Sequence, residues 1–293
     1  MLTGAHMSIA GGVDTSVARG IEVGCRTMQI FTKNANQWTA APIHADTARR
    51  FREELDRSGI GPVVSHDSYL INLGSPDLAL REKSMAAFVD ELDRAEQLGL
   101  VGVVTHPGAH MGQGEEAGLE RVAASLRAVL KTTHRHKVAI LIENTAGQGT
   151  SLGWAVSHLA TLLAGVEGHS RIGFCLDTCH LHAAGHDLST DASYGAFIEA
   201  FDAAVGLDRL RCFHMNDSLK PFGSRVDRHT HIGQGTIGEE PFRRIMCDTR
   251  LAHVPKILET PKVGSGVTED RMNLATLARL GTPPAPARKR KAG

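Results

Sequence analysis

Six apolar segments of this 293-residue chain end at a histidine, an aspartate or a glutamate. The clearest is 172–177, where the run stops at Asp177 and His180 follows three residues later. An isolated buried charge costs several kcal/mol or more, so a buried strand rarely ends in Asp unless the carboxylate meets a cation or several donors. We therefore interpret these ends as strand termini that carry metal ligands. The other five segments are 63–66, 103–106, 138–143, 210–214 and 255–259.

The candidate ligands are imidazoles and carboxylates, drawn from these ends and from the polar stretch after residue 214. They are too many for one tetrahedral ion and suit three ions, with carboxylates that bridge between them. A donor set of nitrogen and oxygen favours Zn²⁺, with Mn²⁺ or Fe²⁺ possible at one site. The candidates are His66, His106, Glu143, Asp177, His180, His214, Asp227, His229 and Glu259.

Simpler interpretations exist for each of these side chains. A lone histidine at a strand end is more often a hydrogen-bonded structural residue, and 227–229 reads equally well as a polar turn. Cys175 and Cys179 flank Asp177 and are possible soft ligands, although both belong to apolar surroundings. The joint pattern of six strand ends favours metal binding. Five further histidines stay outside this set as supporting, phosphate-contacting or solvated residues: His6, His110, His182, His186 and His231.

The charge balance of such a site points to a polyanionic substrate. The whole chain has a formal net charge of zero, which by itself indicates no nucleic-acid partner. Three divalent ions would add six positive charges, and the four carboxylates would remove four of them. The site would therefore attract a phosphodiester. Paired divalent ions also lower the pKa of a water molecule, and a third ion can stabilise a leaving oxygen.

Strand and helix patterns alternate along the whole chain and predict a single α/β domain, a (β/α)8 TIM barrel over residues 1–281. Continuous apolar strands suit a parallel sheet that is buried on both faces. A doubly wound open sheet is the main rival, but it would concentrate the site at one switch point. Ligand types at the ends of most strands instead favour a barrel with its metal site at the C-terminal end of the strands. Helices are expected to end at Gly24, Gly59 and Gly99.

The remaining sequence features concern the C-terminal tail, the cysteines and the cellular compartment. Residues 282–293 form a basic Pro/Ala tail whose composition predicts disorder. Five scattered cysteines predict buried thiols in a reducing compartment rather than disulfides. We see no signal sequence and no run long enough to span a membrane, which predicts a cytoplasmic protein without a membrane partner.

Longer motifs around these residues resemble the endonuclease IV family of apurinic/apyrimidinic endonucleases. The resemblance covers nearly the whole chain short of the tail. It implies a barrel with three zinc ions that acts on double-stranded DNA containing abasic sites, cuts the backbone 5′ to the site to leave a 3′-hydroxyl, and removes blocked 3′ ends. The motifs are 4–6, 31–34, 66–74, 106–108, 142–149, 176–180, 214–217, 223–229 and 258–260.

The resemblance also implies how the ligands divide among the ions. His66 and His106 would hold the first zinc, with Glu143 bridging to the second. Asp177, His214 and Glu259 would complete the second, and the third would be held by His180, Asp227 and His229. Hydroxide shared by the first two ions would attack the phosphorus in line. Glu143 or Glu259 would assist the proton, which makes them the catalytic candidates, and the third ion would stabilise the departing 3′ oxygen.

The resemblance further implies a set of DNA contacts. Tyr69 and Leu70 match the pair that inserts into the gap left by the missing base, because such recognition needs a protein wedge that holds the duplex open. Asn34 and Gln37 keep the family pattern of a second loop. Asn36 departs from it, since the family usually has an arginine there, and we expect a weaker contact or looser discrimination.

Two other classes of function remain open from the sequence. A sugar isomerase or epimerase on a similar barrel would need only one or two ions, and the 227–229 segment and the Tyr69 loop would be surplus to it. A lesion-binding protein without catalysis would be expected to lack some ligands, and none is missing. A nuclease acting on one bent duplex needs only one subunit, so we expect a monomer.

Overall fold

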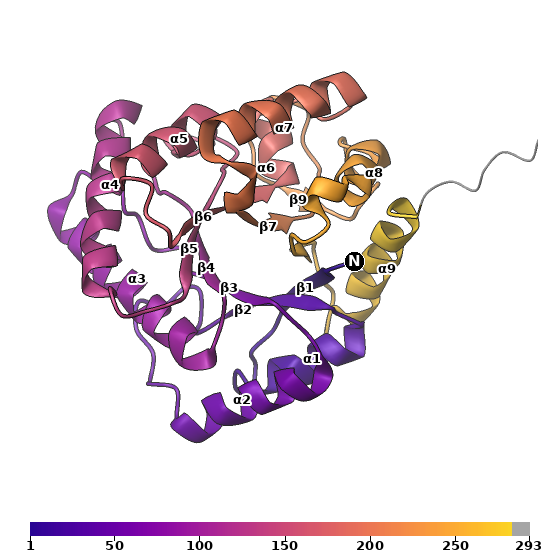
Figure 1. Ribbon diagram of the computed structural model, residues 1–293, viewed down its shortest axis with the longest axis horizontal. Helices are drawn as coiled ribbons and strands as arrows, with labels where there is room; N and C mark the ends of the chain where they lie inside the picture. The colour runs from indigo at the N-terminus through magenta and orange to yellow at the C-terminus, as the bar shows by residue number, and fades with distance from the viewer. Residues whose placement is uncertain (283–293) are drawn as a thin grey trace, which may run out of the picture.

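The computed structural model of the protein describes residues 1–282 and contains a closed barrel of parallel strands. The order around the barrel is β1-β10-β7-β6-β5-β4-β3-β2, so each strand neighbours its predecessor in the sequence and β10 closes against β1 (Figure 1). The barrel strands are β1 (Thr3–Met7), β2 (Thr27–Phe31), β3 (Val63–His66), β4 (Gly102–Thr105), β5 (Ala139–Glu143), β6 (Ile172–Asp177), β7 (Leu210–His214) and β10 (Lys256–Leu258).

Helices follow the strands and surround the barrel, as Figure 1 shows in the view along its axis. They bury an outer apolar core between themselves and the strands, with Phe51, Phe88 and Phe201 fully enclosed. The helices are α1 (Thr15–Val23), α2 (Ala45–Ser58), α3 (Leu78–Leu98), α4 (Glu115–Thr132), α5 (Val156–Gly165), α6 (Thr178–Ala184), α7 (Asp191–Val205), α8 (Glu239–Cys247) and α9 (Val267–Leu280). The predicted TIM barrel is confirmed by this topology.

Local signals in the sequence located the helix ends well. Gly24, Gly59 and Gly99 stand at the C-caps of α1, α2 and α3 with φ angles of 91°, 69° and 72°, a left-handed conformation that glycine adopts without strain. Helix α6 was not predicted. It begins directly after Asp177, whose side chain accepts a hydrogen bond from the backbone N–H of His180 at 2.9 Å and so caps the helix.

An apolar layer fills the interior of the barrel at mid-height. Adjacent positions of six strands supply it, and each of these side chains is buried. Leu141 fits between two glycines of neighbouring strands: a Cβ on Gly102 would lie 2.8 Å from Leu141 Cδ1, and one on Gly173 would lie 3.1 Å from Leu141 Cδ2. The layer consists of Val64, Val104, Leu141, Cys175, Cys212 and Ile257.

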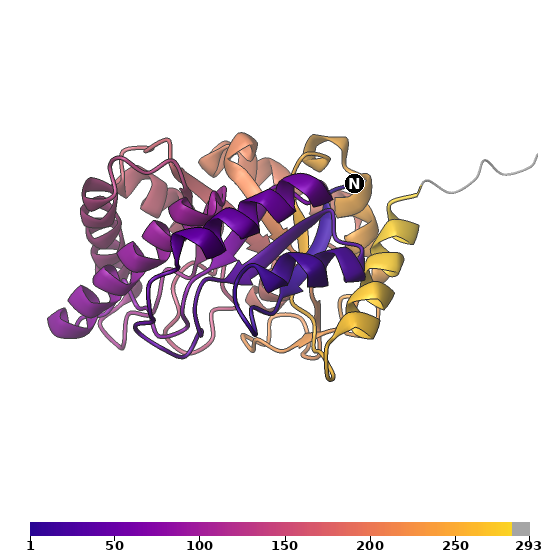
Figure 2. The same ribbon diagram turned by 90° about the horizontal axis from the view of Figure 1, so that it is seen from below.

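Long loops gather at one end of the barrel, the lower edge in Figure 2, opposite the chain's N-terminus. The longest loop, between β7 and α8, contains a small antiparallel pair, β8 (Asp217–Ser218) and β9 (His229–Thr230). None of the helices within residues 1–282 is long and apolar enough to cross a membrane. All five cysteines are free; four are buried as predicted, whereas Cys247 is exposed. The predicted tail lies outside the described residues apart from Thr282.

Candidate metal centre

The predicted strand-end ligands form a second layer, directly above the apolar layer inside the barrel. Alternate residues of a strand point to the same face. Each of six predicted ligands lies two residues after a member of the apolar layer, and therefore points inward as well. His66, Glu143, Asp177 and His214 end strands β3, β5, β6 and β7, whereas His106 and Glu259 follow β4 and β10 by one residue. The C-terminal ends of six strands thus converge on one place.

The nine candidate ligands fall into three groups in the structure. In each group the ligand atoms lie within 4.8 Å of one another. Glu143 belongs to two groups, as a bridging carboxylate must. The division equals the one that the family resemblance implies, although the ions themselves stay a prediction. The groups are His66, His106 and Glu143; then Glu143, Asp177, His214 and Glu259; then His180, Asp227 and His229.

Glu143 lies at the centre of the nine and is fully buried. Its Oε1 is 2.9 Å from His214 Nδ1 and 3.2 Å from His180 Nδ1. Its Oε2 is 3.3 Å from His66 Nε2 and 3.2 Å from His106 Nε2. Burial acts to raise the pKa of Glu143, but His214 and His106 outweigh it and hold the pKa well below its usual value. The residue is therefore a carboxylate that needs positive charge around it.

Hydrogen bonds of the histidine ring nitrogens that point away from the carboxylates indicate where the ring protons are. His66 Nδ1 lies 2.9 Å from the carbonyl of Asp67, and His229 Nδ1 lies 3.2 Å from the carbonyl of Glu259. A carbonyl only accepts, so these nitrogens carry protons, and in the neutral form of each ring Nε2 turns a lone pair toward the carboxylates. Lone pairs facing carboxylate oxygens repel unless a cation lies between them. The residues present therefore fit divalent cations, and each ring is held from behind as metal-ligating histidines are.

His229 and Asp227 complete the third group from the long loop rather than from a strand. His180 Nε2 is 3.1 Å from Asp227 Oδ2, and His229 Nε2 is 3.1 Å from Asp227 Oδ1. Asp227 keeps about 40% of its side chain exposed, so this group opens toward solvent. Burial would raise the pKa of Asp227, but its hydrogen bonds with His180 and His229 hold the pKa far below the usual value.

A buried aspartate that sequence reasoning assigned no role orders this loop. The carboxylate of Asp217 accepts hydrogen bonds from the backbone N–H groups of Ser218, Gly233, Gly235 and Ile237, at 2.7 to 3.1 Å. Four donors on one carboxylate tie the two ends of the loop together across 20 residues. The loop that presents Asp227 and His229 is thus anchored to β8, next to the barrel.

Asn216 is a second supporting residue that the sequence did not single out. Its Nδ2 donates to Asp177 Oδ2 at 2.6 Å, and its Oδ1 accepts from the backbone N–H of Glu259 at 2.8 Å. Three thiols also lie within 4.8 Å of ligand atoms: Cys179 near Asp177 and His229, and Cys175 and Cys212 near His214. Burial raises the pKa of Cys179 to about 12 and that of Cys175 well above its usual value, which disfavours the thiolate form that binds a metal.

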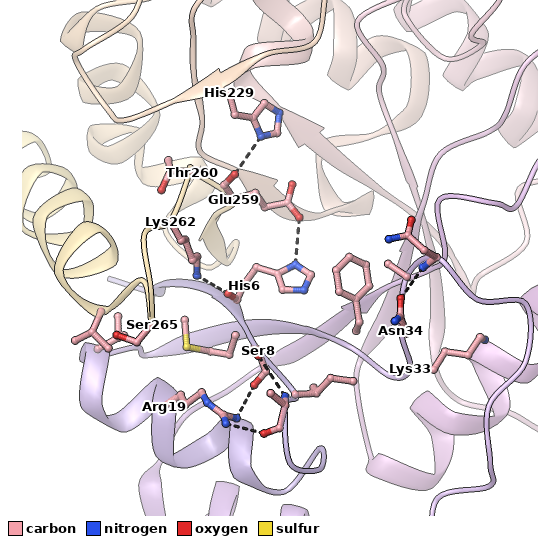
Figure 3. Close-up of a pocket in the computed structure, with 18 of the residues that line it drawn as sticks. His6, Ser8, Arg19, Lys33, Asn34, His229, Glu259, Thr260, Lys262 and Ser265 are labelled. Atoms are coloured by element: carbon pink, nitrogen blue, oxygen red, sulfur yellow. Dashed lines mark hydrogen bonds and ion pairs between the residues drawn. The ribbon is translucent and has the colours of Figure 1, made fainter.

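A cavity of about 740 Å³ opens beside this centre. Figure 3 shows Glu259 and His229 on one side of it and Asn34 on another, with Lys262 and Arg19 along the wall. Arg19 donates to the carbonyl of Ser8, and Lys262 donates at 2.6 Å both to the carbonyl of His6 and to the carboxylate of Asp270. The cavity therefore combines ligand carboxylates with cationic side chains, as a site for a phosphodiester requires.

The predicted DNA contacts surround the mouth of the barrel. Tyr69 is 64% exposed and lies edge-on to Phe31, with ring centroids 5.6 Å apart. Tyr69, Asn34 and Asn36 line the large cavity, whereas Leu70 lines a neighbouring one of about 230 Å³ with His66 and His106. Gln37 is exposed on the same loop as Asn34. The structure brings these side chains next to the ligand groups, and their contact with DNA stays a prediction.

The other histidines set aside from the sequence have local partners. His182 Nε2 is 3.0 Å from Thr236 Oγ1, and His186 Nε2 is 2.8 Å from the carbonyl of Trp154. His6 is the exception, because it contacts Glu259 inside the barrel. Gln29 lies beside it and was missed altogether. A polar residue two positions before the end of an apolar strand was the available signal.

Comparison with known proteins agrees with this geometry. The sequence model of the family described as xylose isomerase-like TIM barrel matches residues 17–280. A protein of Chloroflexus aggregans named "probable endonuclease 4" is 55% identical over 277 residues, covering 94% of this chain and 96% of that protein. A protein of the same name from Geobacter sulfurreducens is 50% identical, covering 94% and 93%.

Solved structures give the same assignment. Endonuclease IV from Thermus thermophilus superimposes with a TM-score of 0.84 at 37% identity and covers 96% of this chain and 98% of that one. A D-tagatose 3-epimerase-like protein superimposes with a TM-score of 0.73 at 17% identity, covering 96% and 98%, which shows a shared fold alone. By its sequence and its barrel, this chain belongs to the endonuclease IV family.

Proposed function

We propose that this protein is a hydrolytic DNA repair enzyme that cuts the phosphodiester 5′ to an abasic site, leaves a 3′-hydroxyl, and clears blocked 3′ ends. The observation that carries the proposal is the convergence of nine nitrogen and oxygen ligands into three groups beside a cavity lined by Tyr69. Its partner would be double-stranded DNA bound by one subunit.

The three groups would hold three divalent cations, with Zn²⁺ favoured by the mixed imidazole and carboxylate donors and Mn²⁺ or Fe²⁺ possible at one position. Cations bound there would supply Lewis-acid chemistry, since they neutralise a phosphodiester and lower the pKa of water toward neutrality. The buried thiols Cys175 and Cys179 are not assigned to this set.

The protein's own residues would then position the substrate and move the proton. Glu143 Oε1 and Glu259 Oε2 lie 2.9 and 3.2 Å from the same nitrogen, His214 Nδ1, so both carboxylates border the place where water would be activated. We assign them the role of accepting its proton. His180, Asp227 and His229 form the group that opens to solvent at Asp227, and they would support the side of the departing oxygen.

Tyr69 and Leu70 would recognise the substrate by filling the space of the missing base. A large exposed aromatic ring beside a metal centre can stack on the neighbouring base. Asn34, Asn36 and Gln37 would contact the backbone from the adjacent loop. With Asn36 the chain offers an amide where an arginine would bring a positive charge, so this contact depends less on charge.

One experiment tests the proposal against both alternatives. The zinc-loaded protein is incubated with a duplex that carries a single tetrahydrofuran abasic analogue, and bound metal is counted in parallel. Incision 5′ to the analogue with about three zinc ions per chain supports the nuclease. Binding without incision would instead support a lesion-binding protein. One or two ions per chain with no action on DNA would support a sugar isomerase or epimerase.

A further inference from the structure

Two strands of the barrel contribute to the ligand layer without supplying a ligand. His6 on β1 and Gln29 on β2 are register partners on neighbouring strands. A Cβ on Gly4 would lie 1.7 Å from the carbonyl oxygen of Thr27, so the glycine lets β1 approach β2 closely at this point. Both side chains contact Glu259, on the far side of the strand closure. His6 and Gln29 therefore lie among the ligands without being candidate ligands themselves, and their hydrogen bonds indicate another role.

The carboxamide of Gln29 contacts three residues of the centre and is fully buried. Its Nε2 lies 2.5 Å from Glu259 Oε1, and its Oε1 lies 2.8 Å from His214 Nε2. A carboxylate can only accept, so the NH₂ group of Gln29 must face Glu259 and its oxygen must face His214. These hydrogen bonds therefore allow only one orientation of the amide.

This orientation fixes the proton of His214. The amide oxygen of Gln29 needs a donor, so the proton of the imidazole is on Nε2. In the neutral ring the other nitrogen, Nδ1, then has a free lone pair, and it is the one that lies 2.9 Å from Glu143 and 3.2 Å from Glu259. A histidine binds a cation only through an unprotonated nitrogen. Gln29 thus selects the tautomer that the second ligand group requires.

The same amide fixes the proton of His6. The second N–H of Gln29 Nε2 points at His6 Nδ1 across 2.9 Å, so that nitrogen must accept and the proton of His6 is on Nε2. His6 packs against Phe31, with ring centroids 4.3 Å apart, and lines the large cavity (Figure 3). Within residues 1–282 its Nε2 is buried without a hydrogen-bond partner. An unmet buried donor at a cavity wall is a group held ready for a ligand.

We propose that Gln29 is a positioning residue of this centre. Its one amide group keeps Nδ1 of His214 free to act as a ligand and turns Oε2 of Glu259 toward that nitrogen. The same group leaves the proton of His6 on Nε2, where it can donate to an anionic oxygen of the bound DNA backbone. The DNA backbone enters through the proposed function. The two tautomers and the support of the metal site do not depend on it.

The first test reads the tautomers directly. Zinc-loaded protein labelled with ¹⁵N-histidine is studied by long-range ¹H–¹⁵N correlation, which distinguishes protonated from bare ring nitrogens. We expect Nε2–H on both His6 and His214, with His214 Nδ1 bound to zinc. A proton on Nδ1 of either ring in the wild-type protein overturns the proposal, whatever the variants do.

Two variants distinguish the role of the Gln29 amide oxygen from that of its amide nitrogen. Gln29→Glu keeps an oxygen toward His214 but replaces the nitrogen, so His214 should retain Nε2–H while the proton of His6 moves to Nδ1. Gln29→Met removes both contacts at similar length and should release the His6 ring from a single tautomer, whereas zinc bound at Nδ1 would still keep the proton of His214 on Nε2. The matched control is Gln97→Met, an exposed glutamine on α3 whose side chain donates only to the carbonyl of Ile43. Unchanged spectra in both Gln29 variants would overturn the proposal.

Affinity and kinetics complete the test. Loss of a group that supports a metal ligand typically costs about 10- to 100-fold in metal affinity or activity, and we expect that loss for Gln29→Met and none for Gln97→Met. Gln29 does not line the cavity, so kcat should fall with little change in KM for the duplex. Wild-type zinc affinity and kcat in Gln29→Met would contradict the proposal. Expected tautomers in a wild-type protein that fails to cut would instead contradict the proposed function alone.

Discussion

Two layers of side chains inside the same barrel differ completely in chemistry although the same strands supply them. The lower layer is dry and apolar, and the upper layer holds histidines and carboxylates. The members on each strand lie only two positions apart, for example Leu141 and Glu143 on β5. Both are fully or nearly fully buried, at 1% and 0% exposure. Burial alone therefore does not distinguish core from site.

The difference lies in what each layer needs in order to be stable. Apolar side chains are stabilised by close packing with one another, and the lower layer has that packing from its neighbours on adjacent strands. Buried charges are costly unless they are paired, and the upper layer gathers the buried carboxylates of Glu143 and Asp177 with Glu259 around His214. The lower layer is complete by itself, whereas the upper layer requires cations. Changes made in one layer at a time should therefore affect incision and stability differently.

Removal of metal should have the largest effect on incision. Stripping the ions with a strong chelator should abolish cutting of an abasic duplex, and added Zn²⁺ should restore it. The free energy of unfolding should fall by about 2.7 kcal/mol for each ion that was present at 100 times its Kd. Incision and thermal unfolding before and after stripping measure both effects. A stripped protein that still cuts would mean that the upper layer is structural.

Glu259→Gln should have the second-largest effect on incision. The variant keeps the size of the side chain but loses the carboxylate that borders His214, so incision should fall by about 10²- to 10⁴-fold while circular dichroism stays that of the wild type. Glu240→Gln, on the exposed surface of α8, is the matched control. Turnover of Glu259→Gln equal to that of the control would remove Glu259 from the catalytic pair.

Tyr69→Ala should have a smaller effect, confined to DNA. Loss of a stacking aromatic ring costs about 1–3 kcal/mol per base, so affinity for an abasic duplex should weaken while the zinc content stays unchanged. Val101→Ala removes an exposed apolar side chain before β4, at the other end of the barrel, and serves as the control. Fluorescence anisotropy measures both affinities. Equal affinities would show that Tyr69 is no wedge.

Leu141→Ala should affect incision least and stability most. A cavity in the lower layer should lower the free energy of unfolding by about 2–5 kcal/mol, because Gly102 and Gly173 leave nothing to refill the space. Zinc content and kcat should remain close to wild type at temperatures where the variant is folded. Denaturant unfolding and incision assays compare this variant with Glu143→Gln, which should show the reverse. A large loss of kcat in Leu141→Ala would mean that the two layers are coupled.

Much of the site could be predicted because its signals are local. A strand that ends in a charged residue, such as Ile172–Asp177, indicates a ligand within a few letters, and helix ends at Gly24 and Gly99 are equally local. Helix α6 was missed because Asp177 is both a ligand candidate and a helix cap, and only one of those roles was considered. Gln29 was missed because one polar residue inside a buried strand is ambiguous until its partners are known.

By itself, the sequence determined the alternation of strands and helices, the residue types at the strand ends and the resemblance to a nuclease family. These follow from period, composition and motif, which are properties of short stretches of chain. The resemblance implied which ligands share a group, but only the tertiary structure shows that their atoms lie close together, and that His6 meets Glu259 across 253 residues. Closure of β10 against β1 makes that contact, and the bond directions of one buried amide then place the protons. Neither can be known before the barrel is closed.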